Sequence, residues 1–175
     1  MGHEDELKEA AEKAREPFDR IVGATMAIVA AALALVSVLG SMSVTKELLW
    51  QQKASDQWAY YQSKSIRRYQ SESAADVLRA LPGPAAVEGA KKYDANVDRY
   101  RQDSDEISRN AHEFEDKSEA NGKHALRFHV AEVFLEIAIV FCSLSLLTRR
   151  RWFWSAAVLL TVIGAGAALT VLGIH

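Results

Sequence analysis

Long uncharged stretches alternate with densely charged ones along this chain, and this pattern predicts its architecture. No Asp, Glu, Lys or Arg occurs at residues 21–45, at 137–148 or from 152 to the end. The 24 residues from 21 to 44 would form about 36 Å of helix at about 1.5 Å per residue, more than the roughly 30 Å hydrocarbon core of a bilayer. We therefore predict an all-α protein with three transmembrane helices, at residues 21–45, 128–147 and 152–174.

The first span is typical of an uncleaved signal anchor rather than a cleaved signal peptide. Residues 1–20 carry seven acidic and four basic side chains, whereas a signal peptide has a basic start and an apolar run of about 7 to 15 residues. No A-x-A-like cleavage site follows the run. Because its apolar residues recur at helical spacing, the acidic tail is expected to be a short amphipathic helix on the cytosolic surface or a frayed end.

Residues 46–127 form a polar insert, which we predict to be an extramembrane antiparallel helical hairpin. The insert holds fourteen basic and fourteen acidic residues and shows little of the alternation typical of strands. Its two prolines fall in the sequence Leu81-Pro82-Gly83-Pro84. Because proline stops one helix and can begin the next, the turn is placed at residues 81–84. No proline separates the second arm from the second span, so one helix is expected to continue through both.

Each arm of the hairpin carries a stripe of apolar and small side chains. In the second arm the stripe follows a strict three-four spacing, typical of a coiled-coil seam: Ala90, Tyr93, Val97, Tyr100, Ser104, Ile107, Ala111, Phe114, Ser118, Asn121, Ala125 and Phe128. The first arm has a looser stripe, broadened by Trp50, Trp58 and Tyr61: Leu48, Ala59, Ile66, Tyr69 and Val77. Long helices cannot bury such narrow stripes alone, so the arms are expected to pack on each other or on neighbouring copies.

The two arms differ in charge. Residues 46–79 hold six basic and four acidic side chains, whereas residues 94–119 hold four basic and nine acidic ones. Opposed arms would attract each other, although each exposed ion pair adds only about 0.2 to 1 kcal/mol. The net charge of the whole chain is −2, which gives no field that would gather nucleic acid.

The short loop at residues 148–151 predicts the orientation in the membrane. It contains Arg149, Arg150 and Arg151, and short basic loops stay in the cytosol, whereas loops beyond about 60 residues are largely discounted. The N-terminus is then cytosolic and the hairpin lies outside. The basic residues at the two ends of the insert are nearly as numerous as those on the side predicted to be cytosolic, and they favour the opposite orientation. The three arginines would also suit an anionic lipid headgroup, although a topology signal alone accounts for them.

The second span contains three polar residues on one face of its helix, His129, Glu132 and Glu136. Burying a carboxylate in hydrocarbon costs at least about 2.5 kcal/mol, and Glu136 lies about 12 Å into the span against about 6 Å for Glu132. Three interpretations stay open: solvation of the shallower two in the headgroup region, a polar contact between helices, or an ion or proton path. A metal site is not expected, because no Cys or second His lies near.

Aromatic side chains cluster in the first arm, at Trp50, Trp58, Tyr61 and Tyr69, among basic residues. Such a cluster could stack nucleobases, but Trp50 lies just beyond the first span, where an amphipathic ring anchors at the interface. We expect packing within the hairpin, or a surface for a protein partner or lipid headgroups, and no nucleic acid.

Small residues in the spans form faces for close helix contact: Gly23, Ala27 and Ala31, Ala30 and Ala34, and Gly164 with Ala168.

Two strings carry a resemblance to a known family. WQQKASDQWAYYQSKSIRRY at residues 50–69 and HVAEVFLEIAIVFCSLSLLTRRRWFW at residues 129–154 resemble the bacterial domain-of-unknown-function 4337 family. The resemblance covers most of the chain from the first span to the third. It implies an uncharacterised multi-pass protein of the bacterial inner membrane, and it brings no activity and no catalytic residue.

These observations lead to an expectation of function. No phosphate-binding loop, dinucleotide fingerprint, nucleophile elbow or paired-cysteine motif occurs, and the single Cys142 excludes an intrachain disulfide. We expect a non-enzymatic membrane scaffold or assembly protein without cofactor or metal, which self-associates through its hairpin and its spans in contact with membrane lipid. The alternatives are an ion- or proton-conducting oligomer using Glu132 and Glu136, and an accessory subunit that docks through the aromatic cluster.

Overall fold

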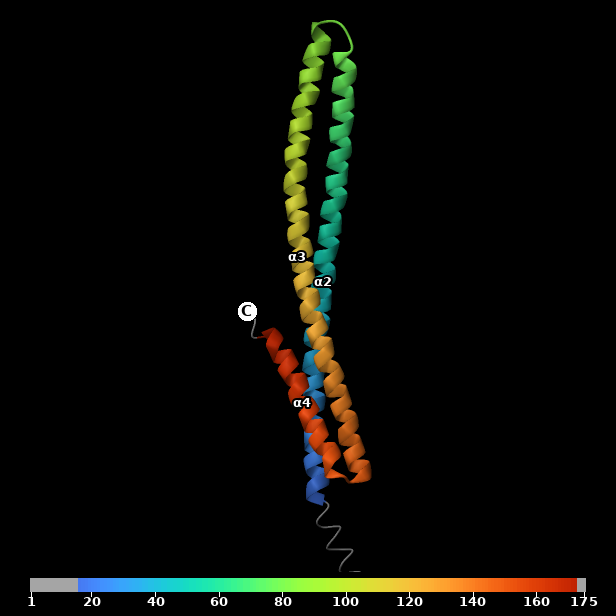
Figure 1. The fold of residues 1–175 in the computed structure, drawn as a ribbon, viewed down its shortest axis with the longest axis vertical. Helices are drawn as coiled ribbons and strands as arrows, with labels where there is room; N and C mark the ends of the chain where they lie inside the picture. The colour runs from blue at the N-terminus through green and yellow to red at the C-terminus, as the bar shows by residue number, and fades with distance from the viewer. Residues whose placement is uncertain (1–15, 173–175) are drawn as a thin grey trace, which may run out of the picture. The chain divides into compact units, whose positions relative to one another are not determined.

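The computed structural model describes residues 16–172, which form three helices joined by two tight turns (Figure 1). The helices are α2 (Glu16–Arg79), α3 (Pro84–Thr148) and α4 (Arg151–Leu172), and no strand occurs among the described residues. Each of the three is long and apolar enough to cross a membrane. The prediction of an all-α fold with three such helices is therefore confirmed.

The helices begin and end close to the bounds of the predicted segments. α2 begins at Glu16, so the last residues of the predicted acidic tail are helical. The rest of that tail, residues 1–15, lies outside the described residues, and so do residues 173 and 174 of the third predicted span. α3 is one helix of 65 residues without a break between the second arm and the second span. Only Arg149 and Arg150 separate α3 from α4, so the loop is shorter than predicted.

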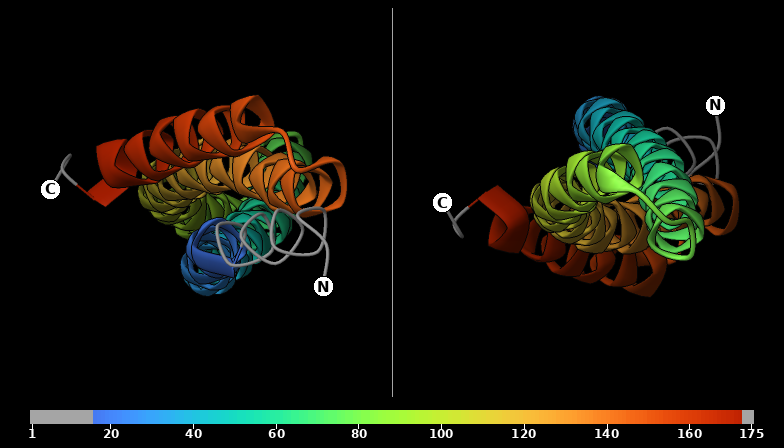
Figure 2. Two further views of the ribbon diagram at one scale, coloured as in Figure 1. Left: turned by 90° about the horizontal axis from the view of Figure 1, so that it is seen from below. Right: turned by 90° about the horizontal axis from the view of Figure 1, so that it is seen from above.

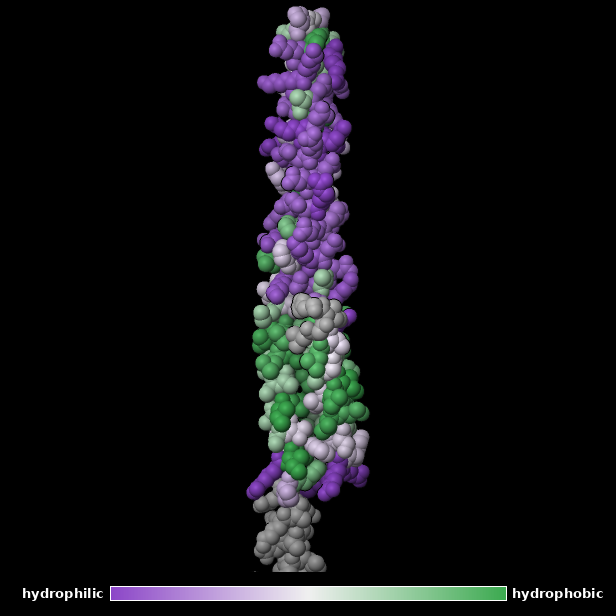
Figure 3. All heavy atoms as spheres, turned by 90° about the vertical axis from the view of Figure 1, so that its left-hand side faces the viewer, coloured by the Kyte–Doolittle hydropathy of each residue, from purple (hydrophilic) through white to green (hydrophobic). Residues whose placement is uncertain are grey.

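The described residues divide into two compact units. The first, which we call the membrane unit, combines the N-terminal part of α2 up to Val44 with the chain from Gly122 onward. The second, the hairpin unit, is Thr45–Asn121. Figure 3 shows hydrophobic side chains gathered over the membrane unit and hydrophilic ones over the hairpin unit.

The core of the membrane unit is shared by all three helices. One buried cluster consists of Val29, Val36, Phe128, Ala131, Leu135, Ala138, Ala168 and Val171. A second cluster consists of Val22 of α2, Cys142 of α3 and Ala157 of α4. α4 runs obliquely to the other two helices of this unit (Figures 1 and 2). The indole Nε1 of Trp154 in α4 donates a hydrogen bond to the Thr25 hydroxyl of α2 at 3.2 Å.

Two glycines in the membrane unit allow helices to approach closely. A Cβ atom on Gly164 of α4 would lie 3.0 Å from the backbone oxygen of Ala131 in α3. A Cβ atom on Gly40 of α2 would lie 3.3 Å from the Cβ of Phe128. The predicted contact face at Gly164 and Ala168 thus packs within the chain, whereas the first-span residues Gly23, Ala27, Ala30, Ala31 and Ala34 are all exposed.

In the hairpin unit, burial on α3 follows the three-four seam. Val97, Ser104, Ile107 and Ala111 are buried, and of the seam residues in this unit only Tyr93 is exposed. α2 contributes small buried residues to the same interface, namely Ala54, Ser71 and Ala75. Small buried side chains of α2 therefore meet both small and larger ones of α3.

The stripe predicted for the first arm does not face α3. Leu48, Ala59, Ile66, Tyr69 and Val77 are all exposed. Of the two partners expected for this stripe, the second arm of the same chain does not cover it, and packing on a neighbouring copy stays a prediction. α3 is met instead by another face of α2, on which Ala54, Ser71 and Ala75 are buried. Trp50, Trp58 and Tyr61 are half-buried and do not belong to the exposed stripe.

The turn between the arms depends on one glycine. α2 ends at Arg79, and Gly83 has a φ of 115°, a backbone conformation that residues with a Cβ rarely adopt. Pro84 then begins α3, where its missing N–H leaves no helical hydrogen bond unmade. The chain reverses direction within residues 80–83 for this reason.

Gly164 and Gly166 provide a matched test of the close contact between α3 and α4. A Cβ on Gly166 meets nothing within 4 Å, whereas one on Gly164 meets Ala131 backbone and the side chains of Leu135 and Phe134. We expect Gly164→Ala to lower the free energy of unfolding by about 1 to 3 kcal/mol through overpacking. Gly166→Ala should leave it unchanged or raise it by up to about 1 kcal/mol through helix propensity. Thermal unfolding of the detergent-extracted protein measures both, and equal effects would contradict the close contact.

Candidate functional site

The three polar residues of the second span lie on α3 in the membrane unit. His129 Nδ1 lies 3.3 Å from Glu132 Oε2, and the Glu132 side chain is 24% exposed. Glu136, one turn further along the helix, is exposed, and no described side chain pairs with it. The structure thus brings His129 and Glu132 together and leaves Glu136 apart, on the surface of the unit.

A shallow groove of about 230 Å³ lies beside this pair, lined by His129, Val130, Val133 and Phe134. Its walls are apolar apart from the imidazole. Among the described residues no group of three or more His, Cys, Asp or Glu side chains is arranged to hold a metal ion. The groove is therefore a feature of the surface rather than a ligand cage.

The three predicted topology arginines gather at the α3–α4 turn. Arg149, Arg150 and Arg151 are all exposed. Arg149 has a φ of 56°, and its N–H donates to the Ser145 carbonyl at 2.8 Å, which closes the end of α3. The Arg151 guanidinium lies 5.7 Å from the centre of the Phe18 ring of α2. Positive charge is thus concentrated at one end of the membrane unit.

The four aromatic residues of the first arm differ in how far they are buried. Trp50, Trp58 and Tyr61 are half-buried between the arms of the hairpin, whereas Tyr69 is exposed. Trp50 stacks on Phe114 of α3 at 5.5 Å between ring centres, with the Lys53 ammonium 4.2 Å above it. Trp50 and Trp58 thus contact side chains of α3, as expected for packing within the hairpin, and Tyr69 lies on the surface.

Trp58 is the centre of a polar cluster that joins the two arms. Its indole Nε1 donates a hydrogen bond to Glu115 Oε1 at 2.8 Å, and His112 Nδ1 lies 2.9 Å from Glu115 Oε2. The His112 ring also meets the Trp58 ring edge to face at 5.1 Å. The hydrogen bond from Trp58, and next the contact with His112, hold the pKa of Glu115 below its ordinary value.

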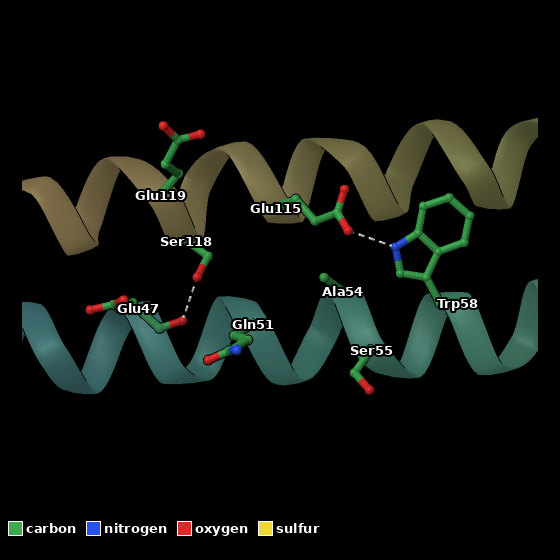
Figure 4. Close-up of a pocket in the computed structure, with 8 residues that line it drawn as sticks. All are labelled: Glu47, Gln51, Ala54, Ser55, Trp58, Glu115, Ser118 and Glu119. Atoms are coloured by element: carbon green, nitrogen blue, oxygen red, sulfur yellow. Dashed lines mark hydrogen bonds between the residues drawn. The ribbon is translucent and has the colours of Figure 1, made fainter.

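This cluster lines a groove of about 460 Å³ between the arms, which the sequence did not predict. Its lining is drawn in Figure 4: Glu47, Gln51, Ala54, Ser55, Trp58, Glu115, Ser118 and Glu119. Trp58 and Glu115 point toward each other, the Ser118 hydroxyl donates to the Glu47 carbonyl at 3.0 Å, and the Glu119 carboxylate points away from α2. The pairing depends on the register of the two arms, and no local sequence signal encodes that register.

Charged residues also connect the arms. The Lys64 ammonium of α2 donates to Asp103 Oδ2 of α3 at 2.8 Å, and this hydrogen bond is the main reason why the pKa of Lys64 is raised. Arg79 pairs with Asp94 near the turn. Both pairs place a base of α2 against an acid of α3, as the charges of the two arms predict.

Comparison with known protein families identifies the family of this chain, and that family has no assigned activity. Residues 18–174 match the family model described as domain of unknown function DUF4337. The chain belongs to this family, and the resemblance drawn from its sequence is confirmed. No curated protein and no solved structure matches the chain.

The Trp58–Glu115 hydrogen bond predicts an effect on titration. A depressed carboxyl pKa contributes stability that is present above the unfolded value of about 4.3 and is lost as the pH falls through the lower folded value. Trp58→Phe removes the donor, so we expect the pKa of Glu115 to rise toward its ordinary value and this acid-dependent stability to shrink. Carbon NMR of the labelled carboxyl group measures the pKa. Trp50→Phe is the control, because it keeps the donor, and an equal shift in both variants would refute the assignment.

Proposed function

We propose that this protein is a non-enzymatic, membrane-anchored scaffold or assembly protein that self-associates through its helical hairpin and its transmembrane helices. The observation that carries the proposal is the apolar surface that the hairpin unit leaves uncovered. Ile66, Tyr69 and Val77 of α2 are exposed in a segment whose other exposed side chains are polar or charged. Exposed apolar patches of this kind mark interaction sites in folded proteins.

The membrane unit supports the same proposal. Glu136 is exposed on a helix long and apolar enough to span the bilayer. Turning this carboxylate to lipid costs at least about 2.5 kcal/mol, whereas a helix of another copy or a hydrated interface would remove the cost. The exposed small residues of the first span, such as Gly23 and Ala27, would allow a second helix to approach closely.

A second candidate function rests on the contact between His129 and Glu132. An imidazole and a carboxylate 3.3 Å apart, followed one turn later by Glu136, are groups that can pass a proton or coordinate a cation transiently. In this alternative the protein is an ion- or proton-conducting oligomer, with Glu132 and Glu136 facing a hydrated path between copies.

We further propose that the protein resides in the bacterial inner membrane, with its N-terminus in the cytosol and its hairpin outside. The exposed cluster of Arg149, Arg150 and Arg151 supports this orientation through the positive-inside rule.

A pair of reporter fusions tests the orientation. An enzyme that is active only outside the cytosol should be active when fused near Gly83 and silent when fused near Arg150, because the arginine loop resists translocation. The opposite pattern of activity would invert the proposed topology.

The mass of the extracted particle and the variant Glu136→Leu together test the function. We expect the wild type to extract as a particle of more than one chain, without ion flux in liposomes. Glu136→Leu should then stay assembled or change its mass, since only a contact is altered. A flux in the wild type that the variant loses would establish the conducting alternative, and a monomeric wild type would exclude both candidates.

A further inference from the structure

The outward face of α2 in the hairpin unit carries a regular uncharged stripe, which we call the outer stripe. Its eight residues follow one another at alternating steps of four and three: Leu48, Gln52, Ser55, Ala59, Gln62, Ile66, Tyr69 and Ser73. All eight are exposed, and the exposed fractions of its large apolar members are 58% for Leu48, 57% for Ile66 and 59% for Tyr69. The next position at this spacing is Asp76, which is exposed and ends the uncharged run.

This spacing fits another helix rather than a small ligand. Steps of four and three repeat every seven residues, which keeps a stripe on one side of a helix that pairs with a neighbour along its length. The outer stripe extends over 26 residues from Leu48 to Ser73 (73 − 48 + 1), about 39 Å at about 1.5 Å per residue. A surface of this length and regularity suits a helix that runs beside it.

Charge decides which helix can do so. One exposed line of α3 at the same spacing is Lys91, Ala95, Asp98, Gln102, Asp105, Arg109, His112 and Asp116. Five of its eight positions carry a full charge. Burying these charges against an uncharged stripe would remove their hydration, and no opposite charge would compensate for it. The outer stripe carries no charge at any position, so the surface in the hairpin unit that suits it is the outer stripe of another copy.

We propose that two copies of this chain pair through their outer stripes, with the two α2 helices parallel and in register. The proposal rests on the proposed self-association and specifies its surface. Copies anchored in one bilayer by the same spans run in the same direction, which makes the pairing parallel and two-fold symmetric. Ile66 and Tyr69 of each copy then pack on their counterparts, with Leu48 of the two copies meeting nearer the spans.

The residues that flank the outer stripe agree with this register. Parallel pairing sets Gln51, Trp58, Ser65 and Glu72 of one copy beside Asp56, Ser63, Gln70 and Val77 of the other. None of these four pairs opposes like charges. The parallel, in-register arrangement that a shared bilayer favours therefore causes no charge repulsion between these flanking residues.

The composition of the outer stripe indicates a contact of moderate strength. Glutamine and serine occupy four of its eight positions, and such polar residues specify register at a cost in stability. Confinement in a membrane compensates, because two anchored copies meet at a high effective concentration. Within the membrane unit, the exposed small residues of the same helix would permit close approach there as well.

Cysteine cross-linking in native membranes tests the proposal. In a Cys142→Ala background, Ser73→Cys and Ala59→Cys should each form a disulfide with the same residue of a second copy on oxidation with copper phenanthroline, which doubles the mass on a non-reducing gel. Asn110→Cys on the exposed face of α3 is the matched control and should not cross-link. Ile66→Lys combined with Ser73→Cys should lose the cross-link, whereas Asn110→Lys combined with Ser73→Cys should keep it.

Circular dichroism separates loss of pairing from loss of folding. Because Ile66 is exposed in the single chain, Ile66→Lys should retain its helix content. An oligomeric wild-type particle without cross-linking at Ser73 and Ala59 would overturn the outer-stripe pairing and leave the proposed self-association standing. A cross-link between Ser73→Cys of one copy and Asn110→Cys of another would overturn the two-fold arrangement. A monomeric wild-type particle would overturn both proposals.

Discussion

The hydrocarbon core of a bilayer accepts backbone only where its N–H and C=O groups are bonded to each other, and the rest of this structure depends on that constraint. α2 and α3 meet it as unbroken helices of 64 and 65 residues. Once a span has formed a helix, each further residue extends it without the cost of a new nucleus. The arms of the hairpin can therefore be helical although only a few residues of α2 are fully buried between them.

Much of this fold follows from local sequence signals. Uncharged length predicts the spans, the Pro82-Gly83-Pro84 sequence predicts the reversal, and the three-four spacing of Val97, Ile107 and their neighbours predicts the inward face of α3. Each signal acts over a few residues, through proline geometry, helix periodicity or the cost of burying charge. Such signals do not depend on what the segment packs against.

The inward face of α2 could not be predicted in the same way. Ala54, Ser71 and Ala75 are buried because α3 approaches closely, yet small or polar side chains give almost no hydrophobic signal. Ile66 and Tyr69 give a strong one and lie outside. A hydrophobic stripe identifies a face that needs a partner without identifying the partner. The Trp58–Glu115 hydrogen bond was missed for a related reason, since it depends on the register between two arms.

Charge separates the two kinds of pairing in the hairpin. Within the chain, a basic arm meets an acidic one, as at Lys64 and Asp103, so α2 selects α3. Between copies, the proposed contact is made by the one face of α2 that carries no charge. A charged outward face on α3 opposes a head-to-tail contact between α2 of one copy and α3 of the next, which would extend into open chains. The same distribution of charge that joins the arms would then also close the assembly at a symmetric pair.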